Sequence, residues 1–149
     1  MRTINPWKSY HQTATTTAPP GQIILMLYDG ALRFLERALE GFRCADPTEL
    51  TLTVHNNLQR ARDIIRELNC CLNLESGGDL AETLRRLYDY FEHRIHTSNI
   101  RKKREGIEEV IGHLSVLRDA WAAMLRGEGH IGLAEPAPAP ALVANSGSY

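Results

Sequence analysis

Hydrophobic residues recur at helical spacing through residues 20–42 and form two parallel seams instead of one. A helix on a protein surface needs an apolar arc about 100° wide, and the two seams together cover a much wider arc. This helix therefore either lies between two neighbouring helices or shows its second seam to a partner outside the chain. The first seam is Ile24, Leu27, Ala31, Phe34 and Ala38, and the second is Leu25, Tyr28, Leu32, Leu35, Leu39 and Phe42.

Three further segments show a single helical seam, bounded by recognisable start and stop signals. The Asp-Pro-Thr-Glu stretch at 46–49 predicts a capped start for a second helix, which runs to about Leu72. The Ser-Gly-Gly-Asp stretch at 76–79 predicts a break before a third helix over 80–97, and a turn around Asn99 leads into a fourth helix. Short connections force neighbouring helices to run antiparallel, so the sequence predicts an all-α, up-down-up-down four-helix bundle.

The bundle is expected to occupy residues 20–127, between an N-terminal arm and a C-terminal tail. The arm, residues 1–19, is polar and Thr-rich but carries Trp7 and Tyr10, which fits either docking on the bundle or a frayed terminus. The tail, residues 128–149, is rich in Gly, Ala and Pro. It cannot bury enough surface to offset its ordering entropy, so we expect it to be disordered.

Composition narrows the classes of partner and compartment. The 17 basic and 18 acidic residues give a net charge of −1, so no global field would attract nucleic acid or an anionic membrane. The three cysteines lack C-x-x-C spacing and are expected to be reduced thiols. No secretion signal begins the chain, and the longest apolar run, residues 23–28, is far below the roughly 20 residues that span a bilayer. We expect a soluble, cytoplasmic protein without membrane insertion.

No arrangement typical of catalysis or of a metal centre is present. A di-iron site in a four-helix bundle needs Glu-x-x-His pairs, and no glutamate is followed by histidine at that spacing. His93 and His96 share a helix face, with only Asp89 and Glu92 nearby as further ligands, so solvated side chains are the simpler interpretation. Because motifs such as H-E-x-x-H and G-x-S-x-G are also missing, we expect neither an enzyme nor a bound cofactor or metal.

Two features remain without a chemical explanation. The Arg-Lys-Lys-Arg run at 101–104 is expected at the start of the fourth helix, where cations oppose the helix dipole. A solvated helix start is the simpler interpretation of this run, and contact with nucleic acid or an acidic partner is the alternative. The wide apolar arcs, which include Tyr88 and Tyr90 beside the third seam, fit either core packing or a long groove that receives an apolar helix from another protein.

Residues 17–30 read Thr-Ala-Pro-Pro-Gly-Gln-Ile-Ile-Leu-Met-Leu-Tyr-Asp-Gly and closely resemble the flagellar secretion chaperones of the FliS family. The family signature there is a Thr-Ala-Ser-Pro lead into an apolar run that ends Leu-Tyr-Asp-Gly. Further matches are Ala-x-x-Ile-Ile-x-Glu-Leu at 61–68, Gly-Gly at 77–78 and Leu-Arg-x-Ala-Trp at 117–121. The resemblance covers about residues 10–125 in the right order.

The resemblance implies a cytoplasmic export chaperone that binds the C-terminal segment of flagellin, prevents premature polymerisation and delivers it to the flagellar type III export gate. It also implies that the arm with Tyr10 covers an empty cargo groove. The alternative is a helical adaptor or regulator that binds another flagellar protein in the same groove. An anti-sigma factor or other flagellar regulator is a candidate second partner. We expect the cargo groove to contain Tyr10, Leu25, Tyr28, Ile64, Leu68, Cys71, Leu84, Leu87 and Tyr88. We expect the core to contain Ile24, Leu27, Phe34, Leu58, Ile65, Phe91, Leu114 and Trp121.

The chain departs from the family pattern at both ends of the predicted bundle. Pro19 stands where the family usually has Ser, and Gly21 where it has Glu or Asp, so the first helix is expected to be less well capped. The family commonly has an Asn-Asp pair before the fourth helix, whereas this chain reads Ile-Arg-Lys-Lys at 100–103. The basic residues there point to a different or additional partner.

Overall fold

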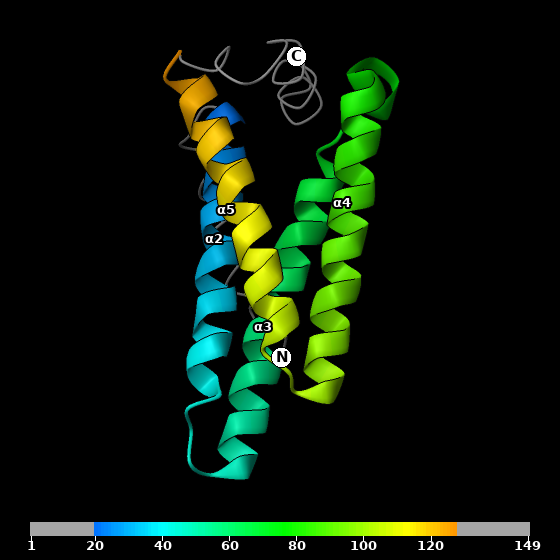
Figure 1. Cartoon of the computed structure of the whole chain (residues 1–149). Helices are drawn as coiled ribbons and strands as arrows, with labels where there is room; N and C mark the ends of the chain where they lie inside the picture. The colour runs from blue at the N-terminus through cyan, green and yellow to red at the C-terminus, as the bar shows by residue number, and fades with distance from the viewer. Residues whose placement is uncertain (1–19, 128–149) are drawn as a thin grey trace, which may run out of the picture.

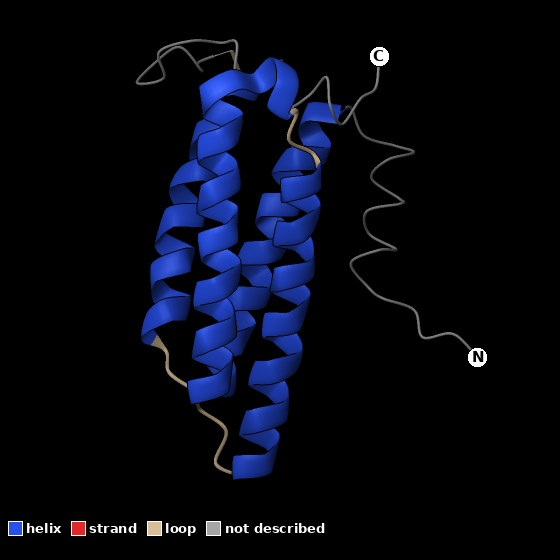
Figure 2. Cartoon of the chain, turned by 90° about the vertical axis from the view of Figure 1, so that its right-hand side faces the viewer, coloured by secondary structure: helices blue, strands red, loops and turns tan. Residues whose placement is uncertain are grey.

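The computed structural model describes residues 20–127, and α-helices make up most of this range. Each helix packs against the next one along the chain, and the last packs against the first, so the four close into a bundle (Figure 1). Successive helices run in opposite directions along one long axis (Figure 2). The predicted four-helix architecture is therefore confirmed, whereas the arm and the tail lie outside the described residues. The helices are α2 (Pro20–Gly41), α3 (Pro47–Cys70), α4 (Leu74–Arg101) and α5 (Glu105–Leu125).

Helix α2 uses both of its apolar seams inside the bundle, because it packs against α3 and α5. Gly30 and Gly41 allow close approach to α3: an added Cβ would lie 3.2 Å from Cδ1 of Ile64 and 2.9 Å from Cγ2 of Thr53, respectively. All five residues of the first seam are buried, and the residues of the second seam are buried or half-buried. This packing favours the interpretation of residues 20–42 as a helix between two neighbours.

The start of α3 agrees with the sequence, whereas the bounds of α4 differ. The side chain of Asp46 accepts a hydrogen bond of 2.9 Å from the Glu49 backbone N–H, and Pro47 occupies the first turn, as predicted. Helix α4 begins at Leu74 and contains Gly78 at φ 60° and ψ −140°, a conformation that side chains with a Cβ rarely adopt. The predicted break is therefore a kink that follows one extra turn of helix.

The predicted turn around Asn99 was wrong, because α4 continues through this residue to Arg101. Asn99 is buried, and its Nδ2 lies 2.9 Å from Nδ1 of His55 on α3. A polar contact between helices thus supports the last turn of α4. Sequence periodicity could not show this contact because the partner is 44 residues away.

The basic run at 101–104 also has a different place from the predicted one. Lys102 has φ +51°, and the backbone N–H of Lys103 donates to the carbonyl of Ser98 (3.1 Å), which closes α4 in a Schellman-type C-cap. Lys102 Nζ donates to the backbone and side-chain oxygens of Asn99 at 2.6 and 2.7 Å. Most of the run therefore ends α4, where cations complement the helix dipole, and only Arg104 stands at the start of α5.

The core lies along the axis of the bundle and receives side chains from all four helices. Every residue that the sequence assigned to the core is buried. These are Ile24, Leu27, Phe34, Leu58, Ile65, Phe91, Leu114 and Trp121.

Candidate functional site

The centre of the bundle holds a polar contact between two helices that are not neighbours in the ring. The hydroxyls of Tyr28 on α2 and Tyr88 on α4 lie 2.6 Å apart and share a hydrogen bond, and both side chains are buried. Burial raises the pKa of Tyr28 to about 12 and the pKa of Tyr88 well above its ordinary value. Burial likewise raises the pKa of the Cys71 thiol to about 12. All three groups are therefore neutral near pH 7, and the thiol is not a reactive nucleophile.

The predicted groove residues fall into three groups. Tyr10 lies outside the described residues, Leu25 and Leu87 are half-buried, and the remaining six belong to the buried core. Their contact with a cargo stays a prediction, and Leu25 and Leu87 are the members with substantial side-chain surface to offer. The six buried residues are Tyr28, Ile64, Leu68, Cys71, Leu84 and Tyr88.

A cluster of polar side chains joins α4 to α5 near the turn between them, and we call Tyr90, Arg94 and Glu109 the clasp. The Glu109 carboxylate accepts hydrogen bonds from the Tyr90 hydroxyl (2.6 Å) and from Arg94 Nε (2.7 Å). These two donors, with Tyr90 the larger influence, lower the pKa of Glu109. Beside them the imidazole of His113 stacks on the Phe91 ring, with centroids 5.9 Å apart. The clasp therefore fixes α4 against α5 at this end.

Farther from the turn, the facing surfaces of α4 and α5 become apolar. On α4, Leu87 and Leu80 continue the face of Arg94 at a spacing of seven residues. On α5, Leu117 and Met124 continue the face of His113 at helical spacing. All four apolar side chains are half-buried and pack against the core. We call Leu80, Leu87, Leu117 and Met124 the apolar edge.

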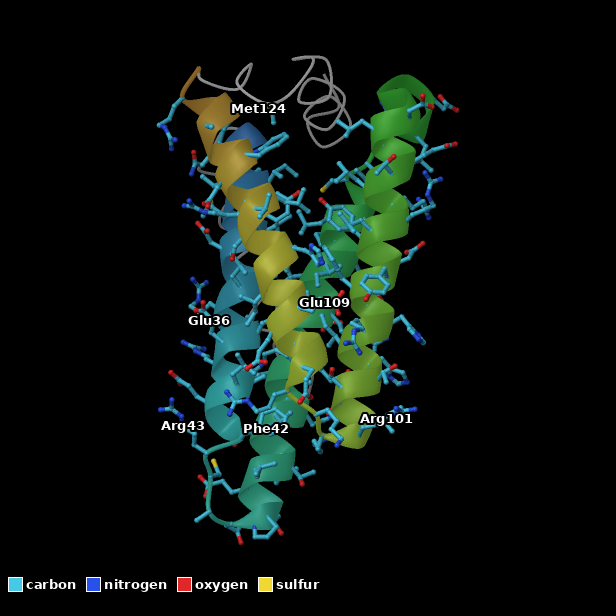
Figure 3. All side chains as sticks on the ribbon, viewed as in Figure 1. Glu36, Phe42, Arg43, Arg101, Glu109 and Met124 are labelled. Carbon is cyan, nitrogen blue, oxygen red and sulfur yellow. The ribbon has the colours of Figure 1, made fainter. Side chains whose placement is uncertain are left out.

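No polar contact closes the apolar edge. Within the described residues, no hydrogen bond or ion pair joins residues 79–89 of α4 to residues 114–125 of α5. The ribbons of α4 and α5 diverge from the connecting turn toward the end of α5, and Figure 3 shows Glu109 near the turn and Met124 near the opposite end (Figures 1 and 3). Val116, on α5 beside this edge, leaves 69% of its surface exposed.

Both helices that border the apolar edge are held on their other sides. Arg118 Nε of α5 donates to Oδ1 of Asp29 on α2 at 2.8 Å, and the buried indole N–H of Trp121 donates to the Gly21 carbonyl at 2.8 Å. Helix α4 is held to α3, where Asn69 Nδ2 donates to Asp89 Oδ1 at 3.0 Å. In this half of the molecule, polar bonds therefore join α5 to α2 and α4 to α3, and the Tyr28–Tyr88 hydrogen bond joins α2 to α4, but none crosses the apolar edge between α4 and α5.

The described residues contain neither a metal-binding cluster nor a membrane-spanning helix. Among residues 20–127, no group of three or more His, Cys, Asp or Glu side chains is placed to hold a metal ion. His93 and His96 are exposed, and His96 Nδ1 lies 3.4 Å from a guanidinium nitrogen of Arg62. Within that same range, no helix combines the length and the apolarity needed to cross a membrane.

Comparison with known proteins identifies the family. Residues 3–128 match the family described as "Flagellar protein FliS". The chain is 34% identical over 128 residues to the flagellar secretion chaperone FliS of Bacillus subtilis (strain 168), covering 86% of this chain and 92% of that protein. It is 36% identical over 126 residues to the flagellar secretion chaperone FliS of Salmonella typhimurium, covering 81% and 90% of the two chains. The matched residues include the whole bundle, and the chain belongs to the FliS family of flagellar secretion chaperones.

Proposed function

We propose that this protein binds the C-terminal segment of flagellin in the cytoplasm, keeps it from polymerising and delivers it to the flagellar type III export apparatus. Membership of the FliS family supports the general role. The observation that carries the binding site is the apolar edge, where half-buried leucines and a methionine of α4 and α5 face each other without a polar bond between the helices.

The physics of the cargo explains why such a surface is useful. A flagellin terminus outside the filament would expose an apolar stripe, and exposed apolar patches favour association. An amphipathic helix laid into an apolar groove buries that stripe through residues at helical spacing. Because binding at the apolar edge involves no chemical step, release of the cargo to the export apparatus is a competition between two binding surfaces.

The groove residues predicted from the sequence have different roles in this proposal. Leu87 belongs both to the predicted groove and to the apolar edge, so it is the first residue to test. Leu25 lies half-buried on α2 and would extend contact around the bundle. Tyr10 and the arm are proposed to cover the groove when no cargo is bound.

Thermal melting of the full chain with a peptide of flagellin's last roughly 50 residues tests the proposal. Peptide at about 100 times its dissociation constant should stabilise the fold by about 2.7 kcal/mol. For a domain of this size the melting temperature should rise by roughly 8–12 °C. The Leu87→Asp and Leu117→Asp variants should each lose most of this rise.

Leu52→Asp is the matched control, because Leu52 is 55% exposed on α3 and lies outside the apolar edge. This variant should keep the full rise in melting temperature. No rise for the unaltered chain at saturating peptide would remove flagellin as the cargo, and a helical adaptor for another flagellar protein would take its place. An equal loss in all three variants would remove the apolar edge as the site.

A further inference from the structure

The turn between α4 and α5 presents exposed cations at the opposite end of the α4–α5 pair from the apolar edge. Arg101, Lys103 and Arg104 are exposed, and Ile100 beside them leaves 68% of its surface exposed. Arg104 forms an ion pair with Glu108 at 3.4 Å, whereas Arg101 and Lys103 make no ion pair within the described residues. Figure 3 shows Arg101 at the end of α4 far from Met124. We call Ile100, Arg101, Lys103 and Arg104 the basic tip.

The basic tip is built on a defined turn. The left-handed backbone of Lys102, with φ +51°, is unusual for a residue other than glycine or asparagine. It is supported by the bonds from Lys102 Nζ to both oxygens of Asn99, which is itself buried and in contact with His55. These contacts hold the backbone on which Arg101 and Lys103 are mounted, so a partner would not have to order this turn.

We propose that the basic tip docks an acidic, amphipathic segment of a partner protein. Carboxylates of the segment would pair with Arg101 and Lys103, and the arginine guanidinium is suited to two-point contact with a carboxylate. Apolar side chains of the same segment would cover Ile100. Leu52, 55% exposed on α3, precedes His55 by one helical turn and is a further exposed apolar side chain on the helix next to α4.

Local charges favour a short acidic peptide over a polyanion. Glu105 and Glu108 lie in the first turn of α5 beside the basic tip and would repel a continuous phosphate backbone or an anionic bilayer. None of residues 99–108 is aromatic, so the tip offers no platform for base stacking. The whole chain carries a net charge of −1, which gives no wider basic field.

This docking does not depend on the proposed cargo site. The apolar edge begins beyond the clasp, so the two surfaces can be occupied together. The flagellin-peptide rise in melting temperature should therefore persist when the basic tip is altered. A negative result for one of the two sites would therefore not contradict the other.

The test uses the full chain and a fluorescein-labelled, 18-residue helical peptide with Leu at every third or fourth position, Glu at four of the remaining positions and Ala at the others. A second peptide has Gln in place of every Glu. We expect the acidic peptide to bind, its affinity to fall with added salt, and Arg101→Glu/Lys103→Glu to weaken it at least about tenfold. Ile100→Ser should weaken it about threefold, and the Gln peptide should not bind.

Arg85→Glu/Arg86→Glu is the matched control, since both arginines are exposed on α4, outside the basic tip. This variant should bind the acidic peptide within about twofold of the unaltered chain. The Arg101→Gln/Lys103→Gln variant repeats the test if charge reversal lowers the melting temperature.

Three results would overturn the proposal: no binding of the acidic peptide, equal loss in the control, or equal binding of the Gln peptide. Binding of single-stranded RNA and of phosphatidylserine vesicles to the same variants is measured as well. Binding of either one with dependence on Arg101 and Lys103, in the absence of peptide binding, would assign the tip to that other class of partner.

Discussion

The two halves of the α4–α5 edge are built from different chemistry. Near the connecting turn, Glu109 accepts hydrogen bonds from Tyr90 and Arg94, and His113 stacks on Phe91. Beyond the clasp, the same two helix faces carry half-buried apolar side chains, and no polar bond within the described residues joins them. One half is closed by directional contacts and the other only by packing.

The difference shows how a four-helix bundle can keep one stable fold and still offer a surface. The clasp sets the register of α4 against α5, while Arg118 and Trp121 hold α5 to α2 farther along. Neither anchor crosses the apolar edge, so a bound segment could contact this edge without breaking a hydrogen bond. Three predictions test this division of roles, from the largest expected effect to the smallest.

Loss of Trp121 should destabilise the fold far more than loss of Leu117, although both lie on α5. Trp121→Ala removes a buried ring and the hydrogen bond to the Gly21 carbonyl, and should cost about 3–5 kcal/mol of unfolding free energy. Leu117→Ala removes a half-buried side chain and should cost about 1 kcal/mol. Urea unfolding measures both. Equal costs would show that α5 depends on α4 as much as on α2 in this half.

The Tyr28–Tyr88 contact should behave as a pair. Tyr28→Phe or Tyr88→Phe alone leaves one buried hydroxyl without its partner and should cost about 1–3 kcal/mol. The double Phe variant should cost clearly less than the sum of the two single changes, because it removes both polar groups. The same unfolding experiment supplies this double-mutant cycle. Additive costs would mean that the hydroxyls act independently.

The clasp should make stability depend on pH in the acid range. The folded state lowers the pKa of Glu109, so its contribution is present above the ordinary glutamate pKa and is lost as pH falls toward the folded-state value. Glu109→Gln should therefore reduce the loss of melting temperature between neutral and acid pH. The effect should be below about 1 kcal/mol, because the carboxylate side chain is 32% exposed.

Glu82→Gln is the control for this titration, since Glu82 is an exposed α4 residue outside the clasp. Its loss of melting temperature between neutral and acid pH should match that of the unaltered chain. A similar acid profile for the Glu109 variant and the unaltered chain would show that the clasp adds no pH-dependent stability.

Most of the fold was readable from the sequence, because helical periodicity and caps are local signals. The Asp46 cap and the eight core positions agree with the structure. The end of α4 was not predicted, because its closure depends on the side chain of Lys102 and on the contact between His55 and Asn99 of different helices. A left-handed lysine has no signature comparable to that of a C-terminal glycine.

The candidate site was only partly predictable. Positions beside a seam can be identified from one helix, but the rotation of each helix against its neighbours decides which of them are covered. Tyr28 and Tyr88, which were expected in the groove, meet in the core, and their contact with cargo stays a prediction. Leu117 and Met124 were not among the groove residues expected from the sequence. The signal available in the sequence was helical spacing, which places Leu117 and Met124 on the same face of the helix as Glu109 and His113.

Hydrogen exchange of the full chain, with and without the flagellin C-terminal peptide, tests the central claim most directly. Amide exchange reports local opening along each helix. We predict that saturating peptide slows exchange in residues 79–90 of α4 and 114–125 of α5, with little change from Arg94 to Glu109. Protection confined to the clasp and the connecting turn, or no added protection when the peptide is bound, would contradict the claim that the apolar edge holds the cargo.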